Sequence, residues 1–451
     1  MSYIPHTDQD RRQMLDAIGV ARTEDLFVDI PERFRFPTLN LPQPLSELEV
    51  SRAVQELAEM NDDLDHHPSF LGAGVYNHFV PAVVNHLLSR GEFYTAYTPY
   101  QPEISQGTLT AGFEFQSMLC ELTGMDVANV SMYDGASALA EAAMMAIRAS
   151  RGRRTKIVVA STVHPEYRQT LRTYTQGMDL PVHEVGFDAE GPTGGRTDIT
   201  VLEREVDDET ACVAVQYPNF FGVIEDLEAM ARVAHDAGAL LVVNANPIAL
   251  GLLKSPGELG ADIVIGEGQP LGIAPGFGGP FLGLFAARKK FMRSMPGRII
   301  GQTTDTNGRR GFVLTITARE QHIRREKATS NICSNEMLMA LAATIYMATM
   351  GRQGLHDVAE LCYHKAHYAA RRIAALDRHD LQFRAPFFHE FVVRGPGPAA
   401  ALNSSLAEAG IVGGYDLGRD YADLPDATLF CVTERNTREE IDLLVDVLTE
   451  A

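Results

Sequence analysis

The sequence predicts an α/β protein with a mostly parallel sheet in a large domain and a smaller α+β domain at the carboxyl end. Short apolar runs alternate with helical patterns between about residues 112 and 290. These runs are apolar throughout, which is typical of strands covered by helices on both faces of a parallel sheet. The length of 451 residues suggests about two or three domains.

Composition excludes several classes of protein. The chain is 45% apolar and 22% charged, which is ordinary for a globular protein, and its formal net charge is −20. A strongly acidic chain lacks the basic surface that nucleic acids require, and an anionic membrane would repel it. We therefore expect no nucleic-acid partner.

Membrane insertion and export are not expected either. The longest nearly apolar stretch, Met337 to Met350, contains two Thr and one Tyr, whereas a spanning helix needs roughly 20 apolar residues. The first residues lack an apolar core and include Asp8, which fits neither a secretory signal nor a transit peptide. We expect a soluble, cytoplasmic protein with no membrane contact.

The cysteines do not form a recognisable framework. They are odd in number, widely spaced and without a C-x-x-C pair, so neither a disulfide scaffold nor a zinc site is expected, and no other metal-ligand cluster stands out. The five are Cys120, Cys212, Cys333, Cys362 and Cys431.

The first hundred residues begin as helix and then become irregular. Ser46 and Glu49 have the spacing of a capping box, which predicts a helix that starts there. The stretch from Phe70 to Gly107 is rich in Gly, Pro and aromatic residues. A long aromatic loop in a compact protein is usually functional or interfacial.

The middle of the chain contains the runs that predict the sheet. Strands are expected at Lys156–Ala160, Ala211–Gln216, Leu240–Val243, Asp262–Ile265 and Phe281–Phe285. Helices are expected at Ala136–Arg148, Pro165–Thr175 and Leu227–Ala237. Ligands of such sheets bind at the carboxyl ends of the strands.

The last part of the chain predicts a smaller unit. Residues 298–335 look polar and irregular, and a long helix is expected from Glu336. Thr437 and Glu440 form a second capping box, which predicts a final amphipathic helix. We expect an N-terminal helical segment over residues 1–70, a large α/β domain over 71–335 and a small domain over 336–451.

Few residues predict chemistry by pattern alone. Two glycine clusters, at Gly72–Gly74 and Gly276–Gly279, lack the strand–glycine–helix order of a dinucleotide site and are interpreted as tight turns. The turn Tyr133–Ser137 precedes a helix and fits either an anion site or an ordinary N-cap. His164 follows a strand and could contact a ligand or be structural, and the basic run Arg319–Lys327 fits a solvated helix face or a phosphate site.

Five motifs together resemble one family closely. They are FLGAGVYNHFVP from Phe70, YTAYTPYQPEISQG from Tyr94, YDGASALAEA from Tyr133, GFGGPFLG from Gly276 and EKATSNICSNE from Glu326. The chain resembles the glycine cleavage system P-protein, the glycine decarboxylase, from about residue 1 to its end. Its length is about half that of a fused P-protein and suits a separately encoded first subunit. The resemblance implies the aspartate-aminotransferase-like fold type I of pyridoxal phosphate enzymes.

The resemblance also identifies two cofactor positions that have changed. In the catalytic half of the family, a lysine follows the strand corresponding to Asp262–Ile265, but here the turn contains Gln269, and no lysine occurs between Lys254 and Lys289. An acidic residue belongs after Leu240–Val243, and here it is Asn244, which cannot balance a pyridinium charge. With Ser137 and His164, these residues are interpreted as vestigial cofactor positions.

The resemblance therefore implies that a lysine-bearing second P-protein subunit binds the pyridoxal phosphate. This chain would lend Tyr97, Tyr100, Glu103 and Thr329 to that partner's site, with the loop Tyr94–Tyr100 buried against the partner. The expected activity is that of glycine dehydrogenase (aminomethyl-transferring), which decarboxylates glycine and passes the aminomethyl group to the lipoyl group of H-protein. Two copies of each subunit are expected.

Two alternatives remain open. The chain could be a non-catalytic scaffold that stabilises its partner or docks the lipoyl carrier. It could also be a self-sufficient pyridoxal enzyme that uses an unrecognised lysine such as Lys254.

Overall fold

The computed structural model describes residues 5–276 and 278–450 and divides the chain into two compact units, Met1–Asp62 and Asp63–Ala451. The first unit contains the helices α1 (Asp8–Ile18) and α2 (Glu47–Ala58). The predicted capping box is confirmed, because the Ser46 hydroxyl accepts from the Glu49 N–H and the Glu49 carboxylate accepts from the Ser46 N–H. Two short 3₁₀ turns, η1 (Thr23–Phe27) and η2 (Glu32–Phe34), lie between the helices.

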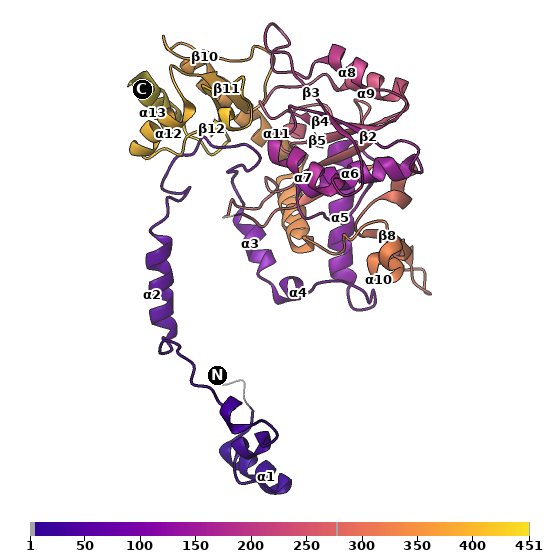
Figure 1. Ribbon diagram of the computed structural model, residues 1–451, viewed down its shortest axis with the longest axis vertical. Helices are drawn as coiled ribbons and strands as arrows, with labels where there is room; N and C mark the ends of the chain where they lie inside the picture. Colours follow the sequence, from indigo (N-terminus) through magenta and orange to yellow (C-terminus); the bar gives the residue numbers. More distant parts are fainter. Residues whose placement is uncertain (1–4, 277, 451) are drawn as a thin grey trace. The chain divides into compact units, whose positions relative to one another are not determined.

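A seven-stranded, mostly parallel sheet forms the centre of the second unit (Figure 1). The strand order is β1-β7-β6-β5-β4-β2-β3, in which β2 to β6 run parallel and β7 is antiparallel to both neighbours. The strands are β1 (Val127–Ala128), β2 (Lys156–Ala160), β3 (Val182–Val185), β4 (Thr210–Tyr217), β5 (Leu240–Ala245), β6 (Ile263–Glu267) and β7 (Gly283–Ala287). The predicted parallel sheet and its five expected strands are confirmed, with ends shifted by a few residues.

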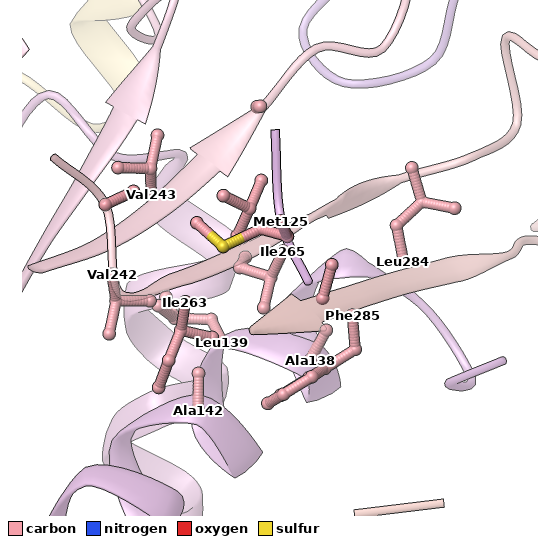
Figure 2. Close-up of a cluster of buried hydrophobic side chains, with 14 of the residues drawn as sticks. Met125, Ala138, Leu139, Ala142, Val242, Val243, Ile263, Ile265, Leu284 and Phe285 are labelled. Carbon is pink, nitrogen blue, oxygen red and sulfur yellow. The ribbon is translucent and has the colours of Figure 1, made fainter. Parts of the chain in front are cut away.

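Helices pack against this sheet through apolar side chains. Helix α6 crosses β4 to β7, and Figure 2 shows Ala138, Leu139 and Ala142 of α6 facing the buried residues of the strands. The small alanines let the helix lie close to the sheet, and each fully buried Leu, Ile or Val contributes about 1.5–3 kcal/mol. The helices are α3 (Ala82–Leu88), α4 (Gly91–Tyr94), α5 (Gln106–Thr123), α6 (Gly135–Ala149), α7 (Pro165–Thr175), α8 (Ile199–Glu205) and α9 (Leu227–Asp236).

The carboxyl-terminal part builds a second, antiparallel sheet of order β10-β11-β13-β12. Helix α11 (Met337–Ile373) leads into it and is interrupted at Gly351, whose φ of 61° favours glycine. The predicted capping box of the last helix is confirmed by hydrogen bonds between Thr437 and Glu440. These elements are β10 (Asp380–Leu381), β11 (Glu390–Arg394), α12 (Ala399–Glu408), β12 (Tyr415–Asp416), β13 (Ala427–Cys431) and α13 (Arg438–Glu450).

The expectation of an irregular stretch over residues 298–335 is wrong in its first part. Strands β8 (Ile299–Thr304) and β9 (Arg310–Thr315) form an antiparallel hairpin there. Its outer end is polar and exposed, so it lacks the apolar alternation that predicts a half-buried strand. The basic run that follows forms short turns and the one-turn helix α10 (Gln321–Arg324), with exposed residues from 321 to 327.

Of the helices that the structure describes, none combines the length and the apolar character that a bilayer span requires.

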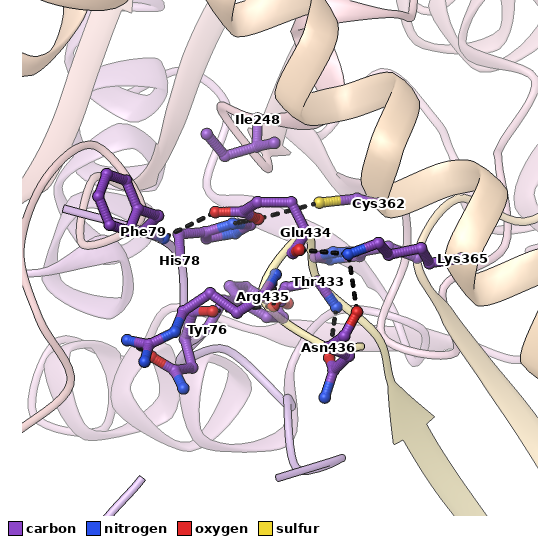
Figure 3. Close-up of polar contacts among 12 residues, drawn as sticks. Tyr76, His78, Phe79, Ile248, Cys362, Lys365, Thr433, Glu434, Arg435 and Asn436 are labelled. Atoms are coloured by element: carbon purple, nitrogen blue, oxygen red, sulfur yellow. Dashed lines mark hydrogen bonds and ion pairs between the residues drawn. The ribbon is translucent and has the colours of Figure 1, made fainter. Parts of the chain in front are cut away.

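A buried polar cluster joins the segment after residue 70 to α11 and to the loop that follows β13 (Figure 3). Nδ1 of His78 lies 2.7 Å from the Glu434 carboxylate, which also accepts from the Phe79 N–H at 2.7 Å and from the Cys362 thiol at 3.4 Å. Lys365 donates to the backbone carbonyls of Glu434 and Asn436. The His78 and Cys362 atoms that could ligate a metal together with Glu434 are thus both hydrogen-bonded to the Glu434 carboxylate.

This cluster predicts a stability that depends on pH. Burial alone would raise the pKa of Glu434, but the hydrogen bond and charge of His78 and the Phe79 N–H outweigh burial and lower it to about 2, from an ordinary 4.5. The stabilisation is therefore present above about pH 4.5 and is lost as the pH falls toward 2. We expect His78→Ala to lower the free energy of unfolding at pH 7 by about 3 kcal/mol, because it removes the imidazole partner of a largely enclosed carboxylate, which then keeps only the Phe79 N–H and the Cys362 thiol.

Urea unfolding at pH 7 and at about pH 4 measures this effect. The difference between wild type and His78→Ala is expected to shrink at the lower pH. The matched control is His66→Ala, which removes an exposed pair with Asp63 and is expected to change little. Equal stability of the two variants at pH 7 would contradict this account of the cluster.

Candidate functional site

The turn before α6 presents backbone N–H groups at the carboxyl edge of the sheet. Asp134 is the N-cap and accepts from the Ser137 N–H at 2.6 Å, while the Ser137 hydroxyl accepts from the Asp134 N–H at 3.2 Å. The Gly135 N–H points instead to a carboxylate oxygen of Glu267, at 3.1 Å. The turn is therefore an ordinary capping box, and the Gly135 N–H donates to a carboxyl group of this chain.

His164 lies buried beside this turn, at the N-cap of α7. Its Nε2 lies 2.8 Å from the Ala73 carbonyl, and its Nδ1 accepts from the Glu166 N–H at 3.2 Å. Burial lowers the pKa of His164, so the ring is neutral near pH 7, with Nε2 as donor. Its ring stacks on Tyr167, with ring centres 4.9 Å apart and planes inclined by 27°.

The position that the resemblance assigns to the lysine is filled by a fully bonded amide. Gln269 accepts from the Tyr76 N–H at 2.9 Å and donates to the Tyr76 carbonyl at 3.0 Å. It also donates to the Ile273 carbonyl at 2.6 Å and is only 1% exposed. Gln269 therefore joins the turn after β6 to the segment around Tyr76. Its paired hydrogen bonds with the Tyr76 N–H and carbonyl resemble those between neighbouring strands.

The position of the acidic residue is also filled by an amide. Asn244 is buried at the end of β5 and donates to the Gln216 side-chain oxygen at 3.1 Å. The same oxygen accepts from the His164 N–H at 2.9 Å. Asn244, Gln216 and His164 thus form one neutral network at the carboxyl edge of the sheet.

Glu267 is a site residue that the sequence analysis missed. Its carboxyl group accepts from the N–H groups of Leu282 at 2.8 Å, Gln269 at 2.9 Å and Gly135 at 3.1 Å. Burial raises the pKa of Glu267 to about 8, and these three N–H groups act against that rise. An acidic residue two positions before Gln269, in a turn expected to hold a phosphate-bearing cofactor, was the signal that could have identified it.

These residues do not fit a pyridoxal phosphate bound in this chain. The strand-end turn offers an amide where the cofactor needs an amine, and Asn244 offers no charge for the ring nitrogen. The N–H groups suited to a phosphate already bind Glu267. Lys254, the nearest preceding lysine, is an exposed residue between η3 (Ala249–Gly251) and β6.

The two loops expected to serve a partner lie together in this chain. Arg298, just before β8, donates to the Tyr100 hydroxyl at 3.2 Å and to the Cys333 sulfur at 3.1 Å, and it pairs with Glu320 at 2.9 Å. Its guanidinium also lies over the Tyr100 ring, 4.9 Å from the centre. The hydroxyls of Thr98 and Ser334 make a second link of 2.5 Å. We name these two segments, residues 94–105 and 328–335, the paired loops.

The candidate residues of the paired loops differ in exposure. Tyr97 and Tyr100 are 67% and 59% exposed, and Glu103 is exposed as well. Thr329 is half-buried, and its N–H donates to the Arg319 carbonyl at 3.2 Å. Its neighbour Ser330 donates to Glu141 of α6 at 2.8 Å, so α6 helps to hold the loop that carries Thr329.

Comparison with known proteins identifies close relatives over the whole chain. The family model described as "Glycine cleavage system P-protein" matches residues 1–448. A protein of Thermomicrobium roseum named "Probable glycine dehydrogenase (decarboxylating) subunit 1" is 56% identical over 100% of both chains. A protein of Brevibacillus brevis with the same name is 55% identical over 98% of this chain and 97% of its own length.

Solved structures agree with the sequence relatives. The crystal structure of a glycine decarboxylase (P-protein) of the glycine cleavage system, in inhibitor-bound form, superposes with a TM-score of 0.91 at 44% identity over 100% of both chains. A glutamate decarboxylase from Lactobacillus brevis matches with a TM-score of 0.68 over 93% of this chain at 14% identity, which shows the fold alone. The expected family resemblance and fold type I class are confirmed.

The contacts of Arg298 with Tyr100, Cys333 and Glu320, which we call the Arg298 junction, predict that the paired loops are ordered together. Arg298→Met removes the donor to Tyr100 and Cys333 and takes the guanidinium partner from the buried Glu320, which costs about 3–5 kcal/mol for a buried pair. We expect hydrogen exchange to rise in both loops and to change little in α6.

A double variant separates the two effects. Arg298→Met with Glu320→Leu removes both charges and is expected to recover most of the stability while both loops still exchange faster. Arg310→Met, an exposed arginine over Phe312, is the control. Unchanged exchange in residues 94–105 of Arg298→Met would rule out the junction.

Proposed function

Since the chain belongs to the glycine cleavage system P-protein family, we propose that it is a subunit of a glycine dehydrogenase (decarboxylating) that contributes residues to its partner's active site. We call this role the lending function. A lysine-bearing second subunit binds the pyridoxal phosphate, and this chain completes that subunit's site. One observation carries the proposal. Gln269, at the lysine position, is buried, and its side-chain amide makes hydrogen bonds with both the N–H and the carbonyl of Tyr76.

The exposed tyrosines support a partner at the paired loops. Tyr94, Tyr97 and Tyr100 are each more than half exposed in the isolated chain. Tyrosines are enriched at protein interfaces, where they bury a large area at a low entropic cost. The junction at Arg298 holds these loops in one arrangement before a partner binds, which lowers the entropic cost of association. This surface therefore suits a permanent partner subunit.

The side chains of the paired loops suit a site that handles glycine and a phosphate-bearing cofactor. Tyrosine and threonine hydroxyls donate to carboxylates and phosphates, so Tyr97, Tyr100 and Thr329 position the substrate or the partner's cofactor. Glu103 braces its loop or faces the substrate amine. The pyridoxal phosphate of the partner supplies the electron sink for decarboxylation.

The aminomethyl group then passes to the lipoyl group of H-protein. The proposed assembly contains two copies of each subunit and is cytoplasmic. The main alternative is a scaffold that only stabilises the partner or docks the lipoyl carrier. Both functions place the paired loops against the partner, and they differ in whether individual hydroxyl groups affect turnover.

Hydroxyl deletions in assembled complexes distinguish these functions. Tyr97→Phe, Tyr100→Phe and Thr329→Ala each remove a donor, and a charge-assisted hydrogen bond is worth about 1.5–3 kcal/mol. We expect turnover of glycine to fall roughly 10- to 100-fold for each. The measurement is kcat and KM for glycine, with H-protein as acceptor.

Complex formation must be checked in parallel by size-exclusion chromatography. Tyr94→Phe removes a hydroxyl from the same loop at a position not assigned to the site, and it is expected to keep wild-type turnover. If the three site variants assemble normally and also keep wild-type turnover, the scaffold function replaces the lending function.

A further inference from the structure

Three groups converge where the vestigial cofactor positions meet, and all of them belong to this chain. They are the ring of Tyr167 on α7, the carboxyl group of Glu267 at the end of β6, and the backbone of the segment Ala73–Tyr76. Each contacts one of the positions that the resemblance assigns to the cofactor. Two of them correspond to the two parts of a phosphorylated pyridine: Tyr167 to the ring and Glu267 to the phosphate.

Tyr167 takes the place of an aromatic ring. It stacks on His164 at 4.9 Å, and its hydroxyl lies so close to Gly135 that a Cβ atom there would be 2.3 Å from it. The phenol therefore extends from the stacking histidine to the turn before α6. A ring that stacked on His164 and carried a phosphate to the turn before α6 would need the space that Tyr167 fills.

Glu267 takes the place of the anionic group. Its carboxyl oxygens accept three backbone N–H groups, from Gly135, Gln269 and Leu282. Gly135 is the first residue of α6, where backbone N–H groups and the helix dipole favour an anion. These donors would serve a phosphate if the carboxyl group were absent.

The segment Ala73–Tyr76 closes the remaining side. The Ala73 carbonyl accepts from Nε2 of His164, and the Tyr76 backbone pairs with Gln269. Gly74, with a φ of 104°, lies so near His164 that a Cβ atom there would be 2.9 Å from Nε2. The segment is therefore pressed onto the site, and only glycine fits at this contact.

We propose that the former cofactor pocket of this chain is occupied by its own side chains, with Tyr167 in place of the cofactor ring and Glu267 in place of its phosphate. The pocket has become an internal anchor for the segment Ala73–Tyr76. Restoring a lysine at position 269 would therefore not restore a cofactor site. This inference concerns the chain's own pocket and stands whether or not the paired loops serve a partner.

Thermal unfolding of the purified full-length chain tests the proposal with two probes, inorganic phosphate and 4-deoxypyridoxine 5-phosphate. The second probe lacks the aldehyde of pyridoxal phosphate and so cannot react with surface lysines. A ligand that binds only the folded state raises Tm in a concentration-dependent way. We expect neither probe to shift the Tm of the wild-type chain.

Variants that remove the side chains filling the pocket are expected to bind the probes. Tyr167→Ala with Glu267→Ser removes both occupants, and the Tm of this double variant is expected to rise about 2–4 °C with saturating 4-deoxypyridoxine 5-phosphate. Glu267→Ser alone is expected to respond to inorganic phosphate but not to the ring compound. The matched control, Tyr167→Phe with Glu267→Gln, keeps both shapes and is expected to respond to neither.

Two results would overturn the proposal. One is a rise in the wild-type Tm with either probe, which needs no variant to fold. The other is a cooperatively folded double variant that responds to neither probe. If the double variant does not fold, Glu267→Ser with inorganic phosphate takes its place, and a lack of response there has the same meaning.

Discussion

The carboxyl group of Glu267, at the half-buried end of β6, accepts three backbone N–H groups, and these hydrogen bonds join three distant parts of the chain. Its donors come from the start of α6, from the turn after β6 and from the approach to β7. An unmet buried carboxyl group would cost several kcal/mol. With this group in place, the turn after β6 is fixed, and Gln269 is aimed at the Tyr76 backbone.

Helix α6 connects the closed pocket with the paired loops. Its first residue donates to Glu267, and Glu141 further along accepts from Ser330, next to Thr329. Glu141 also lies 3.7 Å from Arg148, and burial raises its pKa. One helix thus supports both features that distinguish this chain: a pocket filled from within and a pair of loops with exposed hydroxyl groups.

Much of the fold could be predicted because burial leaves a clear pattern. The run Lys156–Ala160 is almost wholly buried and forms β2 with the expected ends. Strand β3 was not predicted, since it is an edge strand with a partly exposed Val-His-Glu-Val sequence. The hairpin of β8 and β9 was missed because its outer half is polar, although Asn307-Gly308 at its turn was a usable signal.

The candidate site was only partly predictable, for a different reason. Motifs indicated Gln269 and Asn244 because the family chemistry demands other residues there. Nothing in the local sequence indicated that Tyr167 lies on His164 or that Arg298 joins Tyr100 to Cys333, because these contacts depend on how distant elements pack. The domain limits at residues 70 and 335 stay predictions.

The central claim is that this chain holds no cofactor lysine and serves a partner that does. The most direct measurement is borohydride reduction of the assembled complex loaded with pyridoxal phosphate, followed by peptide mass spectrometry to locate the pyridoxyl group. The account predicts one stoichiometric pyridoxyl group per pair of subunits, attached to a lysine of the partner. A stoichiometric pyridoxyl group on any lysine of this chain, Lys254 included, would contradict it.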